Sequence, residues 1–269
     1  MNWKFWKSSG RKSKTREWID ALVFAVVAAT LIRTFLIEAF TIPTPSMEKS
    51  LLVGDFLFVS KVSYGARTPM TPLSFPFVHQ ELPLIGGKSY SEAIKWNYHR
   101  LPGFGKIKNN DIVVFNYPGN SFYPDDDLKR PIDKKTHYIK RCVGIPGDSI
   151  YITDGLLYVN HSPVPLPQKG QLTYTVITDG NAINPKTLEK YQIYEGANLG
   201  GGIYQFTLTH EVADELKKLP FIKSVELYHQ QAGTPNPFQK LFPYDSRYNW
   251  NVDNYGPIWI PKAGATITL

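Results

Sequence analysis

The chain has 269 residues, 42% of them hydrophobic, and a formal net charge of +7 at pH 7. Six of its 30 basic residues lie before residue 17, so the remaining 24 nearly balance the 23 acidic residues. The excess positive charge is therefore confined to one end, which argues against a nucleic-acid-binding surface on the body of the protein. A single cysteine, Cys142, excludes an intrachain disulfide and a cysteine-rich zinc site.

A basic segment, residues 1–17, precedes a long apolar stretch, residues 18–40. A helix over this stretch would be about 34 Å long, enough to cross a hydrocarbon core of about 30 Å. Asp20 lies at its start, and Arg33 and Glu38 lie near its end, where their charges can reach the lipid headgroups. The positive-inside rule keeps residues 1–17 in the cytoplasm. We therefore expect a single transmembrane helix at 18–40, anchored in the lipid bilayer, with the rest of the chain on the far side.

Two other structures could explain the apolar stretch. A buried core helix is disfavoured because residues 21–32 show no alternation of polar and apolar positions. A cleaved secretory signal is disfavoured because the stretch is longer than the usual apolar region and ends in Ile42-Pro-Thr-Pro-Ser46, without a small-x-small cleavage site. A retained anchor is the better interpretation.

The roughly 230 residues after the anchor fit one large β-rich domain or a domain with an insertion. Pro-Gly pairs at 102–103, 118–119 and 146–147 indicate turns between strands. One amphipathic helix is expected at 211–219, where Val212, Leu216 and Leu219 recur at helical spacing. Runs rich in β-branched and aromatic residues predict strands at 55–62, 111–116, 137–143 and 149–153.

A hydrophobic loop, residues 72–78, separates the first of these strands from the next. It is either an ordinary core segment or a loop that dips into the lipid beside the anchor. The sequence leaves both open, because scattered apolar surface is common whereas contiguous patches are not.

Ser46 and Lys140 are the candidate catalytic residues. A serine hydroxyl is a weak nucleophile and needs a base to accept its proton. Lysine can act as this base only where apolar surroundings favour its neutral amine. On a strand Lys140 would share its face with Tyr138 and Cys142, which carry no charge, while His137 would project to the other face.

The residues before Ser46 suggest how an oxyanion could be bound. Pro43 and Pro45 lack an N–H, so the nearest donors are the hydroxyl of Thr44 and the backbone N–H of Ser46. We expect these two groups to form an oxyanion hole. A helix N-cap is the alternative, but the Glu or Gln of a capping box is missing three residues later, where Met47 and Lys49 stand instead.

The order of these motifs resembles one family closely. An apolar span, then Ile42-Pro-Thr-Pro-Ser-Met47, then Gly54-Asp55 before a strand, then Tyr138-Ile-Lys-Arg-Cys-Val-Gly-Ile-Pro-Gly-Asp148 is similar to bacterial type I signal peptidases (leader peptidases). The resemblance implies a mainly β fold: a transmembrane helix, a twisted antiparallel β catalytic domain and a large β-rich insertion. It also implies a serine endopeptidase that needs no metal and no cofactor.

The resemblance assigns roles residue by residue. Ser46 would be the nucleophile, Lys140 the general base, and Thr44 a donor to the oxyanion, while Met47 would pack beside the serine. The substrates would be secretory preproteins, cleaved after their signal peptides on the extracytoplasmic side of the bacterial cytoplasmic membrane. The other matching positions are expected to support the fold: Gly54, Asp55, Lys61, Arg141, Gly144, Pro146, Gly147 and Asp148.

Two departures from the family pattern stand out. Lys49-Ser50-Leu51 replaces the usual Pro-Thr-Leu, a change expected to alter a turn but not the proton transfer. The family's final Gly-Asp-Asn-Arg signature is absent, and Asp245-Ser246-Arg247 copies only a fragment of it, which we interpret as a coincidence. We therefore expect residues 41–154 to form the catalytic core and residues 155–269 an insertion, with the chain ending before the last catalytic strands.

Two other functions were weighed. A soluble self-cleaving repressor would share the Ser-Lys pair, but residues 1–40 offer a membrane span in place of a DNA-binding domain. A catalytically silent, membrane-anchored binding protein remains the alternative, because the closing signature is missing.

Overall fold

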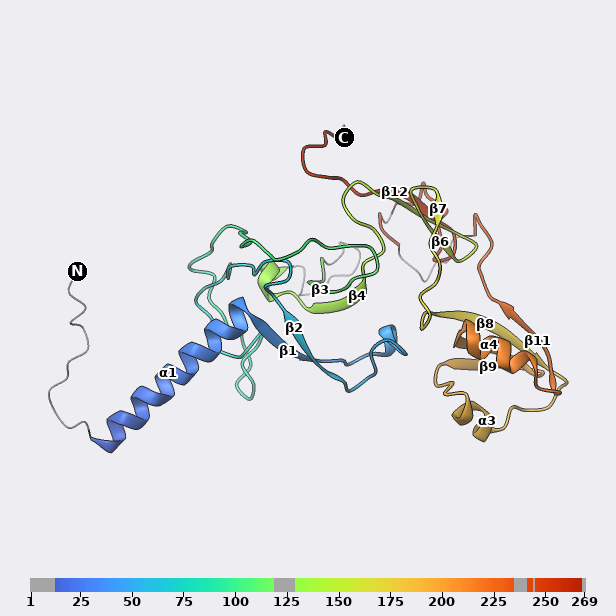
Figure 1. Ribbon diagram of the computed structural model, residues 1–269, viewed down its shortest axis with the longest axis horizontal. Coiled ribbons are helices and arrows are strands. Elements are labelled where there is room, and N and C mark those ends of the chain that lie inside the picture. The colour runs from blue at the N-terminus through green and yellow to red at the C-terminus, as the bar shows by residue number, and fades with distance from the viewer. Residues whose placement is uncertain (1–12, 119–128, 235–240, 244, 268–269) are drawn as a thin grey trace. The chain divides into compact units, whose positions relative to one another are not determined.

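The computed structural model describes residues 13–118, 129–234, 241–243 and 245–267, and its chain forms two compact units (Figure 1). The first unit contains residues 1–41, 56–106 and 114–138, and the second contains 42–55, 107–113 and 139–269. The expected basic segment falls largely on residues 1–12, which lie outside the described residues. Strands outnumber helices and every strand pair that is described is antiparallel, so the expected mainly β fold is confirmed.

Helix α1, Lys14–Phe35, carries the apolar stretch. The Ser13 side chain caps its first turn by accepting from the N–H of Arg16. The helix is long and apolar enough to cross a membrane, and none of its residues is buried by the rest of the chain. An apolar helix that covers no core is consistent with a single-pass membrane anchor.

The helix ends five residues earlier than expected. Strand β1, Ile37–Thr41, occupies the end of the predicted span and pairs with β2, Phe56–Ser60, so that Phe40 faces Leu57. The reason is tertiary: β2 supplies backbone partners, and the buried Glu38 contacts Lys61 just after β2. The remaining 22 residues of α1 still give about 33 Å of helix, enough for a membrane.

The strands expected near Lys140 are present with slightly different bounds. Strand β3, Ile112–Asn116, pairs with β4, His137–Arg141, which ends two residues before the predicted limit. The pairing extends by one step, because the N–H of Cys142 donates to the carbonyl of Asp111 and the N–H of Asn110 donates to the carbonyl of Cys142. Strand β5, Ser149–Thr153, has the predicted bounds, since turns delimit it on both sides.

A small sheet in the second unit has the strand order β12-β5-β6-β7. Asp154 and Gly155, both with positive φ, join β5 to β6, Leu156–Val159, in a two-residue hairpin turn that fits the twist of the strands. The other two strands are β7, Ser162–Pro163, and β12, Tyr255–Trp259.

A second sheet, with the order β11-β8-β10-β9, contains the main hydrophobic core of the described residues. Its two central strands are β8, Gln171–Thr178, and β10, Ile203–Thr209, and both bury alternate side chains on one face. The edge strands are β9, Gly196–Gly200, and β11, Ile222–Leu227. This sheet lies wholly within residues 155–269, the region predicted to be a β-rich insertion.

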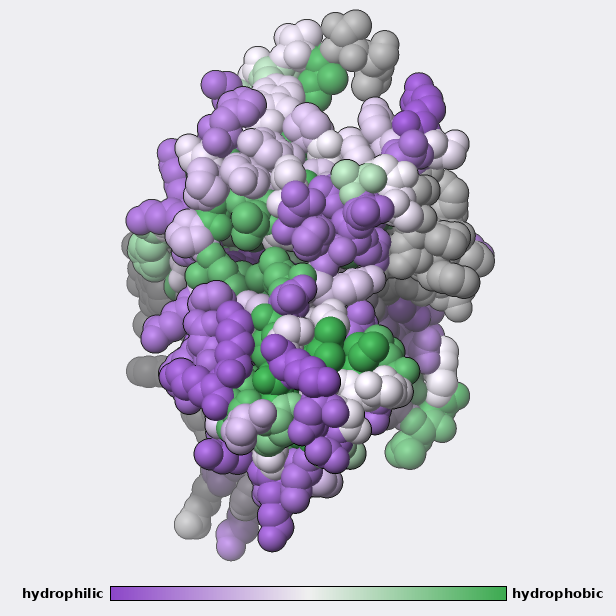
Figure 2. Space-filling model, turned by 90° about the vertical axis from the view of Figure 1, so that its right-hand side faces the viewer, coloured by the Kyte–Doolittle hydropathy of each residue, from purple (hydrophilic) through white to green (hydrophobic). Residues whose placement is uncertain are grey.

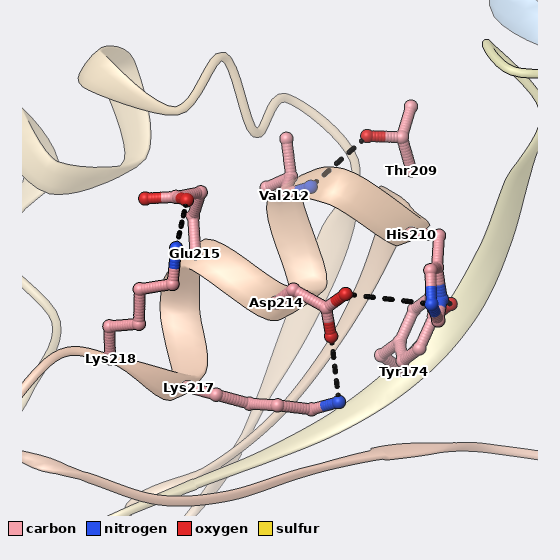
Figure 3. A network of polar contacts seen from close by, with 8 residues as sticks. All are labelled: Tyr174, Thr209, His210, Val212, Asp214, Glu215, Lys217 and Lys218. Carbon is pink, nitrogen blue, oxygen red and sulfur yellow. Dashed lines mark hydrogen bonds and ion pairs between the residues drawn. The ribbon is translucent and has the colours of Figure 1, made fainter.

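Helix α4, His210–Lys217, covers that face of the sheet, and the short helix α3, Pro185–Lys190, precedes β9. The buried residues of α4 are Ala213 and Leu216. The Thr209 hydroxyl caps α4 by accepting from the N–H of Val212 at 3.3 Å (Figure 3). On its exposed side Asp214 contacts both His210 and Lys217 (Figure 3). Such exposed pairs contribute little stability. Figure 2 shows one side of the molecule, where hydrophilic residues surround a central area in which hydrophobic residues are also exposed.

His137 at the start of β4 packs against other rings in the first unit. Its ring centroid lies 4.5 Å from that of His79 and 5.1 Å from that of Phe40. Burial, with a smaller contribution from the nearby His79, lowers the pKa of His137 from 6.5 to about 4. Between about pH 4 and pH 6.5, this histidine would therefore be protonated in the unfolded chain but neutral in the folded chain.

We expect the free energy of unfolding to be highest above about pH 6.5 and to fall as the pH is lowered towards 4, by at most about 3 kcal/mol for this histidine. Thermal unfolding of the full chain in detergent at pH 7.5 and pH 5 would measure the change. His137→Phe should reduce the difference between the two midpoints, whereas substitution of the exposed His161 by Gln should not. An unchanged difference in His137→Phe would show that this histidine is not the group responsible.

Candidate active site

Ser46 lies in a loop, residues 42–55, that connects β1 to β2 and belongs to the second unit. The loop is closed at its base by two backbone hydrogen bonds, from Ile42 N–H to Asp55 and from Gly54 N–H to Ile42. Ile42 is only 3% exposed, and the Asp55 carboxylate accepts from the N–H of Leu52 at 2.8 Å. The Gly54-Asp55 part of the motif thus holds the ends of the loop together.

The nucleophile candidate sits in a single turn of 3₁₀ helix, η1, Pro45–Met47. Proline fits the first position because its fixed φ suits a helical start and its missing N–H would have had no partner there. Thr44 precedes the turn in an extended conformation and makes no side-chain capping bond. Thr44 thus stands at the N-cap position that the alternative proposed, but its hydroxyl makes no capping bond and is available for another contact.

Lys140 on β4 reaches Ser46 directly, although 94 positions separate them in the chain. Its Nζ donates to the Oγ of Ser46 at 2.6 Å and to the carbonyl of Ile139 at 2.9 Å. Lys140 is half-buried, whereas the Ser46 side chain is exposed and open to an approaching peptide. The base and the nucleophile that the sequence proposed are therefore within hydrogen-bonding distance.

Two donors lie beside the Ser46 hydroxyl. The Oγ1 of Thr44 is 3.4 Å from the Oγ of Ser46. The backbone N–H of Ser46 occupies the second position of η1, where a helix offers no internal acceptor. The arrangement can do acyl-transfer chemistry: a hydroxyl, an amine to take its proton, and two donors for a developing oxyanion.

Other motif residues hold the elements that carry this pair. Arg141, next to the lysine, donates to the carbonyl of Asn110 at 3.1 Å and to the Ser50 hydroxyl at 3.4 Å, so it joins β4 to the Ser46 loop. The Asp148 carboxylate accepts from the N–H of Ile145 at 3.0 Å, and side-chain amides also donate to it. These donors hold the pKa of Asp148 below its usual range.

The Asp245-Ser246-Arg247 triplet makes only local contacts in the described part of the chain. The guanidinium of Arg247 pairs with the carboxylate of Asp245, and the N–H of Tyr248 donates to the Asp245 carbonyl. No described contact of the triplet reaches Ser46 or Lys140. Its resemblance to the family's closing signature therefore has no counterpart in the geometry of the site.

One contact of the Ser46 loop was missed from sequence. Lys49, where the family usually has proline, donates to the Oε1 of Gln192 at 2.9 Å and to its backbone carbonyl at 3.2 Å. The ammonium also lies 5.6 Å from the ring centroid of Tyr194. Lys49 thus ties the loop to the segment between α3 and β9, in the region expected to be the insertion. The departure from proline was the only signal in the sequence, and a partner 143 positions away could not be inferred from it.

We expect Lys49→Met to lower kcat/KM by less than about tenfold, because an exposed charged contact is weak and the reacting groups are untouched. Gln192→Ala should have a similar effect. The double variant should be no worse than either single one if the two residues act through their mutual contact. Steady-state cleavage of a preprotein, the substrate that the family resemblance implies, would measure the cycle, and fully additive effects would argue against the contact.

Several known proteins are similar in sequence to this chain. The chain is 33% identical to the signal peptidase I of Rickettsia massiliae (strain Mtu5) over 164 residues, 61% of this chain and 50% of that protein. It is 33% identical to that of Rickettsia akari (strain Hartford) over 169 residues, 63% of this chain and 51% of that protein. It is 29% identical to that of Rickettsia bellii (strain OSU 85-389) over 164 residues, 61% of this chain and 46% of that protein.

The chain spans about half the length of the curated relatives that it matches. The model of the family described as signal peptidase, peptidase S26, matches residues 15–200. The matched range begins in α1 and includes Thr44, Ser46 and Lys140, so it takes in the proposed catalytic groups. By this match over more than half of its residues, the chain belongs to the peptidase S26 family of signal peptidases.

Proposed function

We propose that the protein is a membrane-anchored serine endopeptidase that removes N-terminal signal peptides from exported preproteins. The observation that supports this most is the 2.6 Å contact between the Nζ of Lys140 and the Oγ of Ser46. Serine and lysine so close together are the minimum for nucleophilic catalysis without histidine or metal. Membership of the signal peptidase family supplies the substrate class.

The proposed reaction has two halves. Lys140 in its neutral form accepts the proton of Ser46 as the Oγ attacks the scissile carbonyl carbon, and the carbonyl oxygen becomes an oxyanion. The hydroxyl of Thr44 and the N–H of Ser46 donate to that oxyanion. The C–N bond then breaks, the leaving amine takes the proton from the Lys140 ammonium, and an acyl-enzyme remains.

In the second half Lys140, neutral again, removes a proton from a water molecule. The resulting hydroxide attacks the ester carbonyl, the Ser46 oxygen leaves, and it regains its proton from Lys140. The peptide would bind in an extended conformation, by adding as a strand beside the site, which presents the scissile bond to the exposed Ser46.

For the location we propose a single-pass protein of the bacterial cytoplasmic membrane, with its N-terminus in the cytoplasm and Ser46 on the extracytoplasmic side. The length and apolar surface of α1 support the anchor. The basic residues before it support the orientation. Anchoring is useful because the signal peptide of the substrate is itself apolar, so enzyme and substrate share one membrane surface and meet at a higher effective concentration.

The test is cleavage of a preprotein by the purified full chain in detergent, with the products identified by mass spectrometry. Wild type should release one mature protein with a new N-terminus after the signal peptide. Ser46→Ala should release none, while Ser162→Ala, which alters an exposed serine on β7, should cleave normally. Cleavage by Ser46→Ala would rule out the proposed nucleophile. A folded wild-type chain that binds the preprotein without cleaving it would instead support the silent binding protein.

A further inference from the structure

A cavity of about 210 Å³ lies in the first unit, at the C-terminal end of α1. Its wall combines the last turns of the helix, around Arg33, with residues 67–79 and residues 133–137. At roughly 30 Å³ per water molecule it has room for about seven waters, or for a small polar group of similar size. If α1 spans the membrane as proposed above, this end of the helix reaches the extracytoplasmic headgroup layer, and the cavity lies there too.

One group of charges in the cavity is internally paired. Glu38 is 8% exposed and lies between Arg33 and Lys61, with an N···O distance of 2.8 Å to each. One carboxylate facing two cations leaves an excess of one positive charge. His79 and His137 also line the cavity, and burial lowers the pKa of both, so they add no charge at neutral pH.

Asp133 also lines the cavity, and only one oxygen of its carboxylate has hydrogen-bond partners among the described residues. Its Oδ2 accepts from the N–H of Met70 at 3.0 Å, from the N–H of Thr71 at 2.9 Å and from the Thr71 hydroxyl at 2.8 Å. Its Oδ1 is buried and has no donor among the described residues. A buried acceptor without a donor is costly, so a native fold normally provides it with a partner from the protein, the solvent or a ligand.

Two cations beside Asp133 lack acceptors. Lys134 is only 8% exposed, and its ammonium lies 5.3 Å from the ring centroid of Tyr90. Within residues 13–118 and 129–234, neither the Lys134 ammonium nor the Arg67 guanidinium makes a hydrogen bond or an ion pair. Burial lowers the pKa of both groups, with Asp133 only partly offsetting it. Both charges are therefore poorly compensated by the protein alone.

The partners that Asp133, Arg67 and Lys134 lack indicate the chemistry of a ligand for this cavity. Arg67 and Lys134 require anionic oxygen atoms, and the Oδ1 of Asp133 requires a hydrogen-bond donor close to that anion. A phosphodiester whose headgroup carries a hydroxyl or an ammonium group meets both requirements, and arginine and lysine are the usual partners of phosphate. We propose that this cavity binds the headgroup of a membrane phospholipid, with Arg67 and Lys134 donating to the phosphate and the headgroup donating to Asp133.

The apolar surroundings favour a lipid over free phosphate as the source of this group. The 72–78 loop lines the cavity on one side and exposes three large side chains, with Leu73 47%, Phe75 59% and Phe77 51% exposed. Exposed hydrophobic residues that adjoin one another indicate a binding or membrane surface. Acyl chains of a lipid held in the cavity would lie against this loop and α1, whereas free phosphate would leave both uncovered. The inference rests on the proposed anchorage but not on the proposed chemistry.

The test uses the full chain with Ser46→Ala, so that binding is measured independently of cleavage. Native mass spectrometry in detergent would follow the titration of dioleoylphosphatidylglycerol, whose glycerol carries hydroxyl donors, and dioleoylphosphatidylcholine, whose trimethylammonium carries none. We expect the first lipid to bind at least about tenfold more tightly. Arg67→Gln and Lys134→Met should each weaken its binding, and the pair together by more than tenfold, while Lys106→Met, an exposed lysine outside the cavity, should leave it unchanged.

Thermal unfolding without lipid separates lost binding from lost folding. Lys134→Met should keep or raise the unfolding midpoint, because it removes a poorly compensated charge and keeps the contact with Tyr90. Equal binding of the two lipids would overturn the role of Asp133 and with it the proposal, as would variants that bind like wild type. Displacement of the lipid by equimolar inorganic phosphate would show a phosphate site instead of a lipid site. Flotation with vesicles tests the anchor separately, so a chain that floats but shows no lipid preference refutes the cavity proposal alone.

Discussion

Lys140→Met is expected to slow preprotein cleavage by about 10³-fold, within the range that general-base catalysis contributes. Methionine keeps an unbranched side chain of similar length but cannot accept the proton of Ser46, so the contact now made at 2.6 Å is lost without a large change in volume. Lys140→Arg should be equally slow, because a guanidinium retains the positive charge but cannot act as a base. The loss should appear in kcat, measured under single-turnover conditions with saturating enzyme.

The double variant separates a catalytic pair from two independent contributions. Residues that act in one proton transfer are strongly non-additive, so Ser46→Ala combined with Lys140→Met should be no slower than Ser46→Ala alone. Lys108→Met, which alters an exposed lysine of the same unit, should cleave at the wild-type rate. Cleavage by Lys140→Met within tenfold of wild type would mean that another group accepts the proton.

Elements bounded by their own turns could be predicted from the sequence. Strand β5 was predicted with its observed limits. Pro146-Gly147 precedes it, and the structure shows a second turn at Asp154-Gly155 after it; such turns are local features. Three apolar residues at helical spacing predicted a helix at 211–219, and the observed helix α4 has nearly the same bounds. In both cases the relevant information lies within about ten consecutive residues.

The end of α1 could not be predicted in this way. Ile37, Ala39 and Phe40 continue the apolar character of the helix, interrupted only by Glu38, and composition alone favours a longer span. Their strand conformation depends on pairing with β2, in a register where Glu38 faces Val59 and Phe40 faces Leu57. Strand formation depends on such partners more than on intrinsic preference, so a pattern within a single segment underestimates it.

In the candidate site, too, local features could be predicted from the sequence, whereas contacts between distant residues could not. The turn around Ser46 follows from its prolines, but the meeting of Ser46 with Lys140 was inferred from the family resemblance and not from any local pattern. The contact of Lys49 with Gln192 had no sequence signal beyond the departure from proline, and the cavity beside Asp133 had none, because each joins residues far apart in the chain. Whether Thr44 serves the oxyanion also stays a prediction, and it can be tested directly.

Thr44→Val is expected to lower kcat by about 10² to 10³-fold, the usual effect of removing one donor from an oxyanion hole. Valine has nearly the same shape as threonine but no hydroxyl, so the group now 3.4 Å from the Ser46 Oγ disappears while its volume remains. KM should change little, because the hydroxyl is needed in the transition state and not for holding the peptide. Rates would be measured with the same preprotein, together with those of Thr44→Ser, which should retain most of the wild-type activity.

A structural effect of the same substitution can be distinguished from a catalytic one. Thr44 is exposed and makes no capping bond to η1, so Thr44→Val should leave the thermal unfolding midpoint within about 1 °C of wild type, as expected for a surface change of less than 0.5 kcal/mol. Thr41→Val, an exposed threonine in β1, serves as the matched control and should lose neither activity nor stability. If Thr44→Val keeps the wild-type kcat, the Ser46 N–H and a donor from elsewhere must bind the oxyanion. If Thr44→Ser is as slow as Thr44→Val, the methyl group and not the hydroxyl positions Ser46.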